Sequence, residues 1–267
     1  LIGSSCTGTN TPASITPNAG EVITCTFTNE EDANIIVVKQ TDPNGDSTSF
    51  EFDPSYAANF FLSDGQSNDS GDLSPGTYSV SEIVPAGWDL TSATCTDGTP
   101  ASISLQAGET VTCTFNDQKD AFIIVDKVTD PTGDPTLFDF TTSYGLPFSL
   151  TDATAPNNSS DLVPGTYSVA EAAEPGWDPT SATCDDGSPV GAISLQAGET
   201  VTCTFDNTKQ GKITIVKDAQ PNDCQNFAFT MTGKPNFSLD DDSGVADCLD
   251  SNQPQSSTFN NLPANAN

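Results

Sequence analysis

The sequence ISLQAGETVTCTF occurs twice in this chain, at residues 103–115 and again at residues 193–205. A looser copy, SITPNAGEVITCTF, occupies residues 14–27. In each copy two short strand-like segments flank a turn that contains Ala-Gly-Glu. This pattern predicts a β-hairpin in which ISL is one strand and TVTCTF is the next. A segment that recurs at nearly constant spacing indicates a tandem array of similar domains.

Two further segments recur in the same order and define the repeat. One is a strand of the type Ile-x-Val-x-Lys, and the other contains Pro-Gly-Thr-Tyr-Ser-Val and ends in Gly-Trp. The copies of the first are NIIVVKQTDPNGD (34–46), FIIVDKVTDPTGD (122–134) and KITIVKDAQPND (212–223). The copies of the second are DLSPGTYSVSEIVPAGW (72–88) and DLVPGTYSVAEAAEPGW (161–177).

The aligned copies predict four pieces. Residues 32–119 and 120–209 are expected to be complete β-sandwich repeats. Residues 1–31 correspond to the C-terminal part of a repeat, and residues 210–267 to the N-terminal part of a further one. We expect both outer pieces to be cut from a longer tandem array.

The local pattern within each repeat predicts an all-β fold. Short alternating segments are separated by Gly-Asp, Pro-Gly and Ala-Gly-Glu turns, and no stretch has a sustained helical period. We expect small Greek-key sandwiches of about seven strands per repeat, of the prealbumin or immunoglobulin type. Linkers of a few residues would join them into a rod.

The charge of the chain restricts its partners. The net charge is −30, from 37 acidic residues against seven lysines, with no arginine and no histidine. Such a chain has little with which to neutralise phosphates, so nucleic acid is excluded as a partner. No apolar run approaches the length of a membrane span, so we expect none in this segment.

The eight cysteines predict disulfides and therefore an extracellular protein. A zinc site is disfavoured because the chain has no Cys-x-x-Cys and no histidine. The simplest pairing joins each Thr-Cys-Thr-Phe cysteine to the one before it, and the last two cysteines to each other. The expected bonds are Cys6–Cys25, Cys95–Cys113, Cys184–Cys203 and Cys224–Cys248. A loop of about 18 residues makes each bridge worth about 3 kcal/mol on the chain-entropy account.

Polar residues of complementary type are predicted to face the core of each repeat. The lysine of the Ile-x-Val-x-Lys strand lies on the side of the aliphatic residues in three copies: Lys39, Lys127 and Lys217. An acid shares a face with the tyrosine and valine of the Tyr-Ser-Val strand in two copies: Glu82 and Glu171. A polar residue at the end of the last strand follows the parity of Cys and Phe: Asn29, Asp117 and Asn207.

Burial would give these groups chemistry. Desolvation disfavours the ammonium form of a lysine, which makes the amine a nucleophile, and it favours the protonated form of a glutamic acid. Attack of the amine on an Asn or Asp carbonyl gives an isopeptide bond and releases ammonia or water. The alternative is that the lysines lie on sheet edges, where they discourage edge-to-edge pairing, while the acids merely end strands.

The motifs I-x-V-x-K, Y-x-V-x-E-x₃-P-x-G-[WY] and T-F-x-N resemble those of Cna B-type, SpaA-like or prealbumin-like domains, which build stalks and pilins of microbial surface proteins. The resemblance covers essentially the whole chain. It implies two isopeptide sets, Lys39 with Glu82 and Asp117, and Lys127 with Glu171 and Asn207. Lys217 and Asn29 lack partners in the incomplete repeats. The cysteines and the Gly-Trp ending depart from the usual pilin pattern.

The sequence contains no catalytic motifs, and two of its loops are candidate calcium sites. The loops TDPNGD and TDPTGD could hold Ca²⁺ through Asp42, Asp46, Asp130 and Asp134. They lack the later bidentate glutamate of an EF-hand, however, and a hairpin turn is the simpler interpretation. No histidine, no G-x-S-x-G motif and no phosphate loop is present, so we expect no enzyme and no required cofactor.

The sequence therefore predicts a structural extracellular protein, a segment of a tandem-repeat surface fibre, stalk or filament whose main partner is itself. An alternative is an adhesin that binds a surface ligand through its loops, because the complete repeats differ mostly in residues 47–72 and 135–160. A third possibility is polymerisation through strand exchange between subunits.

Overall fold

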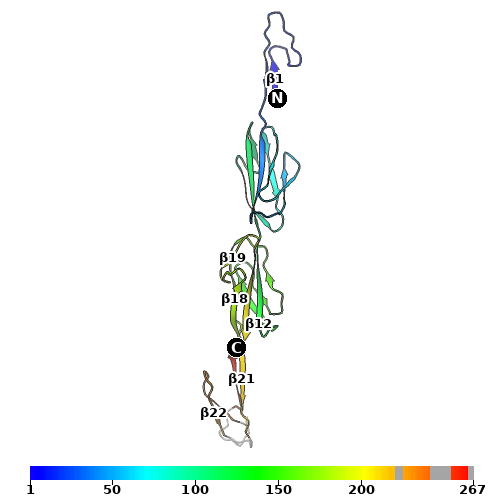
Figure 1. Cartoon of the computed structure of the whole chain (residues 1–267). Coiled ribbons are helices and arrows are strands. Elements are labelled where there is room, and N and C mark those ends of the chain that lie inside the picture. Colours follow the sequence, from blue (N-terminus) through cyan, green and yellow to red (C-terminus); the bar gives the residue numbers. More distant parts are fainter. Residues whose placement is uncertain (220–224, 241–253, 264–267) are drawn as a thin grey trace. The chain divides into compact units, whose positions relative to one another are not determined.

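The computed structural model describes residues 1–219, 225–240 and 254–263, and every regular element in these ranges is a β-strand (Figure 1). The all-β fold expected from the alternating pattern is confirmed. Within the same ranges, no helix is long and apolar enough to cross a membrane. Two regions have a full set of strands and are called here the first domain (β3 to β11) and the second domain (β12 to β20).

The first domain consists of nine strands, and two of its sheets pack around one core. The strands are β3 (Asn34–Asp42), β4 (Phe50–Pro54), β5 (Phe60–Leu62), β6 (Ser67–Asp69), β7 (Gly76–Tyr78), β8 (Val80–Ile83), β9 (Trp88–Cys95), β10 (Ile103–Leu105) and β11 (Thr110–Lys119). One sheet has the order β6-β3-β11-β9, and the other strands form the sheet β5-β4-β8 and the pair β10-β7. The first and last strands, β3 and β11, are parallel neighbours, with Val37 opposite Cys113.

The second domain repeats this topology strand for strand. Its strands are β12 (Phe122–Asp130), β13 (Phe138–Thr142), β14 (Phe148–Leu150), β15 (Asn157–Asn158), β16 (Gly165–Tyr167), β17 (Val169–Glu171), β18 (Trp177–Cys184), β19 (Ile193–Leu195) and β20 (Thr200–Lys209). The sheet orders are β15-β12-β20-β18, β14-β13-β17 and β16-β19. Both domains therefore place the Ile-x-Val-x-Lys strand inside a four-stranded sheet.

The expected number of strands, about seven per repeat, was too low, and one of the additional strands arises because the Tyr-Ser-Val segment forms two strands. The chain leaves the ladder at Ser79, between β7 and β8. Before this point Tyr78 pairs with Ile103 of β10, and after it Val80 pairs with Pro54 of β4. One apolar segment thus serves two different pairing partners.

The predicted hairpin in the repeated ISLQAGETVTCTF stretch is wrong. β10 pairs with β7, whereas β11 pairs with β3 and β9, so the two halves of the stretch belong to different sheets. Both edges of β11 are occupied by these partners, which leaves no edge for β10. The turn is still formed, because Glu109 N–H donates to Gln106 O and Gly108 adopts a positive φ of 74°. Its effect is to carry the chain from one sheet across the core to the other.

Aromatic side chains fill the space between the sheets. In the first domain Phe52 meets Phe115 edge to face, with ring centroids 5.1 Å apart. In the second domain Phe140 meets Phe205 at the same separation. All four side chains are buried, and such pairs favour edge-to-face geometry because the ring edge is positive and the face negative.

The terminal parts form smaller pairs of strands. At the N-terminal end β1 (Gly3–Cys6) pairs with β2 (Cys25–Thr28). At the other end β21 (Gly211–Val216) pairs with β24 (Ser256–Leu262), and β22 (Phe227–Phe229) pairs with β23 (Phe237–Leu239).

Candidate functional site

Three disulfides join adjacent antiparallel strands. They are Cys6–Cys25, Cys95–Cys113 and Cys184–Cys203. These are three of the pairs expected from the sequence, and in each complete domain the partners lie directly opposite each other in the ladder. The fourth expected pair, Cys224–Cys248, lies outside the described residues. Each bridge of a complete domain ties the outer strand of the four-stranded sheet to the strand beside it.

The lysine of the first domain lies inside the core beside two acids. Lys39 is fully buried, and its Nζ contacts Oδ2 of Asp117 on β11 and lies 3.3 Å from Oε1 of Glu82 on β8. The same Nζ donates to the carbonyl of Gln40 and lies 4.1 Å from the centroid of the Phe50 ring. The parallel pairing explains the meeting, because Lys39 is opposite Phe115, two residues before Asp117 and on the same face.

The second domain holds the equivalent lysine against two backbone carbonyl oxygens and one acid. Lys127 is 2% exposed, and its Nζ donates to the carbonyl oxygens of Phe205 and Val128, each at 2.8 Å. Oε1 of Glu171 lies 3.5 Å from the same nitrogen. Asn207 is also buried, and its Oδ1 has no hydrogen-bond partner. A carbonyl oxygen without a partner inside a protein is unusual and costly.

These positions exclude the edge-strand alternative for both lysines. β3 lies between β6 and β11, and β12 lies between β15 and β20, so neither lysine is on a sheet edge. The structure therefore brings together each set that the motifs indicated. It does not do so for Lys217, whose Nζ donates to the carbonyl of Asp218 and lies over the Phe227 ring. Asn29 follows β2 in the separate N-terminal part.

Burial shifts the protonation of the acids and of one lysine. It raises the pKa of Glu82 to about 7, and the charge of Asp117 adds to the effect, while Lys39 opposes it. Burial likewise raises the pKa of Glu171, against the opposing effect of Lys127. The pKa of Lys127 is lowered by burial, which Glu171 partly offsets. Both shifts are in the direction of a neutral amine and a protonated acid, the states needed for nucleophile and proton donor.

The Asp-Pro loops are organised around carboxylates that sequence reasoning missed. Oδ1 of Asp64 accepts a hydrogen bond from the N–H of Thr41 and Oδ2 accepts one from Gly45, both within the TDPNGD loop. Asp152 accepts from Thr129 and Gly133 in the second domain. The backbone N–H groups of each loop therefore point toward one of these carboxylates. An Asp that lies 19 residues from the loop gives no local signal for this role.

The calcium candidates are partly engaged in other contacts. Asp42 accepts from the Gln118 amide, while Asp46 forms an ion pair with Lys119 at 2.8 Å. In the second domain Asp134 pairs with Lys209 at 2.6 Å, and Asp130 is exposed at the end of β12. In the part of the chain that the structure describes, no three His, Cys, Asp or Glu residues form a group that could hold a metal ion.

Lys119 and Lys209 form a second repeated cluster that the sequence analysis did not identify. Each lies over a tryptophan ring, with Lys119 Nζ 5.5 Å from the centroid of Trp88 and Lys209 Nζ 5.3 Å from that of Trp177. Lys119 also lowers the pKa of Asp46 to about 2. The available signal was the equal position of both lysines, four residues after the phenylalanine of the last strand.

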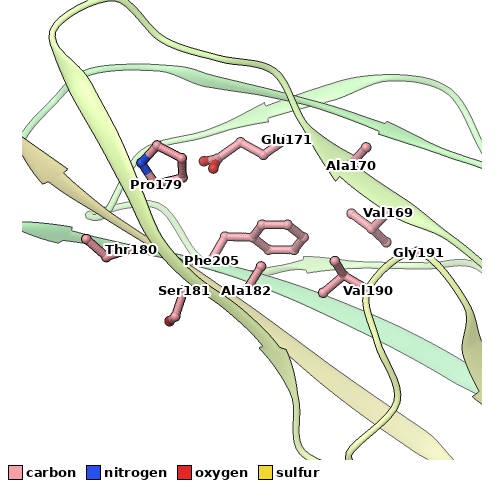
Figure 2. A pocket seen from close by; sticks show the side chains of 10 residues that line it. All are labelled: Val169, Ala170, Glu171, Pro179, Thr180, Ser181, Ala182, Val190, Gly191 and Phe205. Carbon is pink, nitrogen blue, oxygen red and sulfur yellow. The ribbon is translucent and has the colours of Figure 1, made fainter.

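A cavity of about 530 Å³ opens beside the acid of the second domain. Figure 2 shows the Glu171 carboxyl directed toward Pro179, with the Phe205 ring across the centre of the cavity. The remaining lining comes mainly from β17 and β18 and from the loop that contains Val190. This cavity connects Glu171 with the surface of the domain.

Comparison with known families agrees with the fold. A family model described as a prealbumin-like fold domain of SpaA type matches residues 35–119 and again residues 123–209, and a related model matches residues 3–31. The chain therefore belongs to the family of SpaA-type prealbumin-like fold domains. The resemblance inferred from the lysine, glutamate and Thr-Phe motifs is confirmed.

Solved structures give weaker likenesses. The Bacillus anthracis TIE protein is 19% identical with a TM-score of 0.34, over 89% of this chain and 45% of that one. The major pilin protein (T-13) from Streptococcus pyogenes is 14% identical with a TM-score of 0.31, over 67% of this chain and 98% of that one. The pilus adhesin SpaC from Lactobacillus rhamnosus GG is 16% identical with a TM-score of 0.27, over 70% of this chain and 32% of that one.

This chain spans less than half of the Bacillus anthracis protein that it matches. No curated protein matches the sequence. The family assignment rests on the sequence models, because these TM-scores are too low to support an argument.

Proposed function

We propose that this chain is a segment of an extracellular tandem-repeat protein that forms a surface fibre, stalk or filament. Each complete domain would be closed by one disulfide and by one Lys–Asx isopeptide bond. The observation that carries this proposal is the buried lysine of each domain, which lies against a glutamate whose pKa is raised. In the first domain Lys39 shares a face with Asp117 on the neighbouring strand. In the second domain Lys127 Nζ donates to the carbonyl of Phe205, two residues before Asn207. Membership of the SpaA-type family supports it.

In the second domain the neutral amine of Lys127 would attack Cγ of Asn207. A new bond forms between Nζ and Cγ, the bond from Cγ to Nδ2 breaks, and ammonia leaves. Glu171 would donate its proton to the departing nitrogen and take up the proton that the attacking nitrogen loses. In the first domain Lys39 would attack Cγ of Asp117 with loss of water, and Glu82 would have the same role.

A permanent crosslink suits a protein outside the cell. The disulfide and the isopeptide would close loops of different length, and each would restrain the unfolded chain. A structural role also agrees with a high negative charge, which keeps neighbouring molecules soluble and apart. We propose that the main partners are neighbouring repeats and further copies of the protein, and that the chain needs no cofactor and turns over no external substrate.

Mass spectrometry of the intact chain tests the crosslinks directly. The reduced protein should be lighter than its sequence by one ammonia and one water, and peptide maps should join the Lys127 peptide to that of Asn207 and the Lys39 peptide to that of Asp117. Glu171→Gln should restore the ammonia, and Glu82→Gln the water. A reduced wild-type mass equal to that of the plain sequence would disprove both isopeptides and leave only the disulfides.

A loop region of the second domain favours an adhesin as the second candidate. Leu146 is 88% exposed beside a cavity of about 350 Å³ that is also lined by Tyr144, Pro147 and Asn157. These residues lie within residues 135–160, where the two complete domains differ most. Beads coated with the whole chain should then adhere to cells, and Leu146→Ser should weaken the adhesion. Equal retention of both coatings would rule against binding at this loop.

A further inference from the structure

The acid of the second domain is more accessible than its counterpart. The side chain of Glu171 is 9% exposed, whereas that of Glu82 is 1% exposed. The difference corresponds to the cavity of about 530 Å³ beside Glu171 (Figure 2). Its rim includes Ala170 and Ala182, two small and exposed side chains that leave the opening free.

A second cavity reaches the other reacting group. It has a volume of about 280 Å³ and is lined by Asn207 and Asp206 of β20 and by Thr129 of β12. Both cavities share Thr180 and Ser181 of β18 as a wall. The ladder shifts register here, since Pro179 is opposite Asn207 and Ser181 is opposite Asp206, which leaves Thr180 as an extra residue. The bulge at Thr180 thus lies between an opening toward Glu171 and an opening toward Asn207.

The size and lining of these openings limit what can pass. The wider cavity is mainly apolar, with Phe205, Val169 and Val190 around a single carboxyl group. A short alkyl chain fits such walls, and an amine at its end can bond to the carboxyl group of Glu171. Asn207, whose buried Oδ1 has no hydrogen-bond partner, lines the second cavity on the other side of the bulge. Anions are disfavoured by the carboxyl group and by the charge of the chain.

We propose that the two cavities flanking the Thr180 bulge form a site for small primary amines. Ammonia leaves Asn207 through this site, and a short alkylamine reaches Asn207 through it when the lysine amine is absent. The inference rests on the proposed crosslink between Lys127 and Asn207 and adds a ligand class and a route to it.

The exchange reaction balances without any further reagent. The amine nitrogen forms a bond to Cγ of Asn207, and the bond from Cγ to Nδ2 breaks. Glu171 gives its proton to Nδ2, which leaves as ammonia, and takes up the proton that the amine loses. The product is an Asn207 side chain with an alkylated amide. Propylamine is the matched probe, because replacement of Lys127 by alanine removes three carbons and one nitrogen.

The test uses the whole chain with Lys127→Ala, incubated with propylamine and examined by peptide mass mapping. We expect the Asn207 peptide to gain one propylamine and lose one ammonia. When Glu171→Gln is combined with Lys127→Ala, the rate of propylamine incorporation should fall by about a hundredfold, as for loss of a general acid–base group. When Ala182→Leu, at the rim of the cavity, is combined with Lys127→Ala, most of the propylamine incorporation should be lost. Thr183→Leu, on the opposite face of the same strand, should leave it unchanged.

A second variant covers the case in which Lys127→Ala does not fold. Lys127→Met keeps an unbranched apolar side chain that is only one atom shorter, and isotope-labelled ammonium then replaces propylamine as the probe. We expect labelled nitrogen at Asn207, with the same dependence on Glu171 and Ala182.

The outcomes separate the two proposals. Wild-type protein that loses ammonia, combined with variants that take up neither probe, overturns the amine site and leaves the crosslink intact. Uptake that Ala182→Leu does not reduce overturns the route through these cavities. Wild-type protein that loses no ammonia overturns the crosslink, and the amine site fails with it.

Discussion

The two complete domains share a topology but differ in one reacting residue. In the first domain Lys39 contacts the carboxylate of Asp117, so a buried positive charge meets a buried negative one. In the second domain Asn207 replaces the carboxylate, and Lys127 donates to two backbone carbonyl oxygens. One scaffold thus holds the same lysine either beside two acids, as Lys39 is, or beside one acid and two carbonyl oxygens, as Lys127 is.

The largest difference in stability between the two domains should follow replacement of the residue that the lysine would attack, Asp117 or Asn207. Asp117→Ala leaves the buried Lys39 with Glu82 but without Asp117, and we expect it to cost about 3–5 kcal/mol in an uncrosslinked first domain. Asn207→Ala removes a neutral group and should cost the second domain about 1–3 kcal/mol. Each complete domain has one tryptophan, so denaturant unfolding can be followed by fluorescence in Trp177→Phe and Trp88→Phe backgrounds. Equal costs would contradict the contrast between the sites.

Removal of the disulfide should affect both domains alike. The bridges close nearly equal separations, 18 residues for Cys95–Cys113 and 19 for Cys184–Cys203. We expect replacement of either pair by alanine to cost about 3 kcal/mol of unfolding free energy. The same fluorescence titrations measure it, and a loss in one domain more than twice that in the other would show that local strain or residual structure matters.

Much of this comparison was readable from the sequence, because alternation on a strand fixes which side chains face inward. Lys39 and Asp117 follow that parity, and both are buried. The meeting of the two strands was not predictable from local patterns. β3 pairs with β11 in parallel across more than 70 residues, so no turn signal joins them. The hairpin predicted in ISLQAGETVTCTF was wrong for a similar reason. A turn sequence indicates that the chain reverses, but it does not indicate with which strands the next strand pairs.

Burial raises the pKa of both Glu82 and Glu171, so the two domains should respond alike to pH through these acids and differ in alkaline solution through Lys127. The folded pKa of Glu82 is raised from 4.5 to about 7, so the folded first domain holds a proton that the unfolded chain releases. Its stability should therefore fall as the pH rises from about 4.5 to about 7, by about 1–3 kcal/mol without a crosslink. In the second domain the lowered pKa of Lys127 adds the opposite trend in alkaline solution, where stability rises toward pH 10.5.

Thermal unfolding of the two single-tryptophan variants across this range measures the effect. Glu82→Gln provides the control, because it removes the titrating group and should flatten the acidic part of the profile for the first domain. A first domain whose stability rises between pH 5 and pH 7 would contradict the assignment.

The smallest effect should follow removal of the exposed lysine at the end of each domain. The side chain of Lys119 is 39% exposed, so its ion pair with Asp46 is screened by solvent. We expect Lys119→Ala to cost less than about 1 kcal/mol, and less again at high salt. Lys209→Ala should act in the same direction. If the loss of unfolding free energy does not depend on salt, then Lys119 stabilises the domain by packing its aliphatic stem on Trp88 and not by its ion pair.

The parallel pairing of β3 and β11 also decides how each complete domain responds to force. The chain enters the domain on β3 and leaves it on β11, so tension applied at the two ends slides these strands past each other. The ladder from Asn34 opposite Thr110 to Asp42 opposite Gln118 then resists as a whole, whereas an antiparallel pair pulled from one end opens one bond at a time. An isopeptide between these two strands would carry the tension through a covalent bond, and the strands between them would remain unstretched.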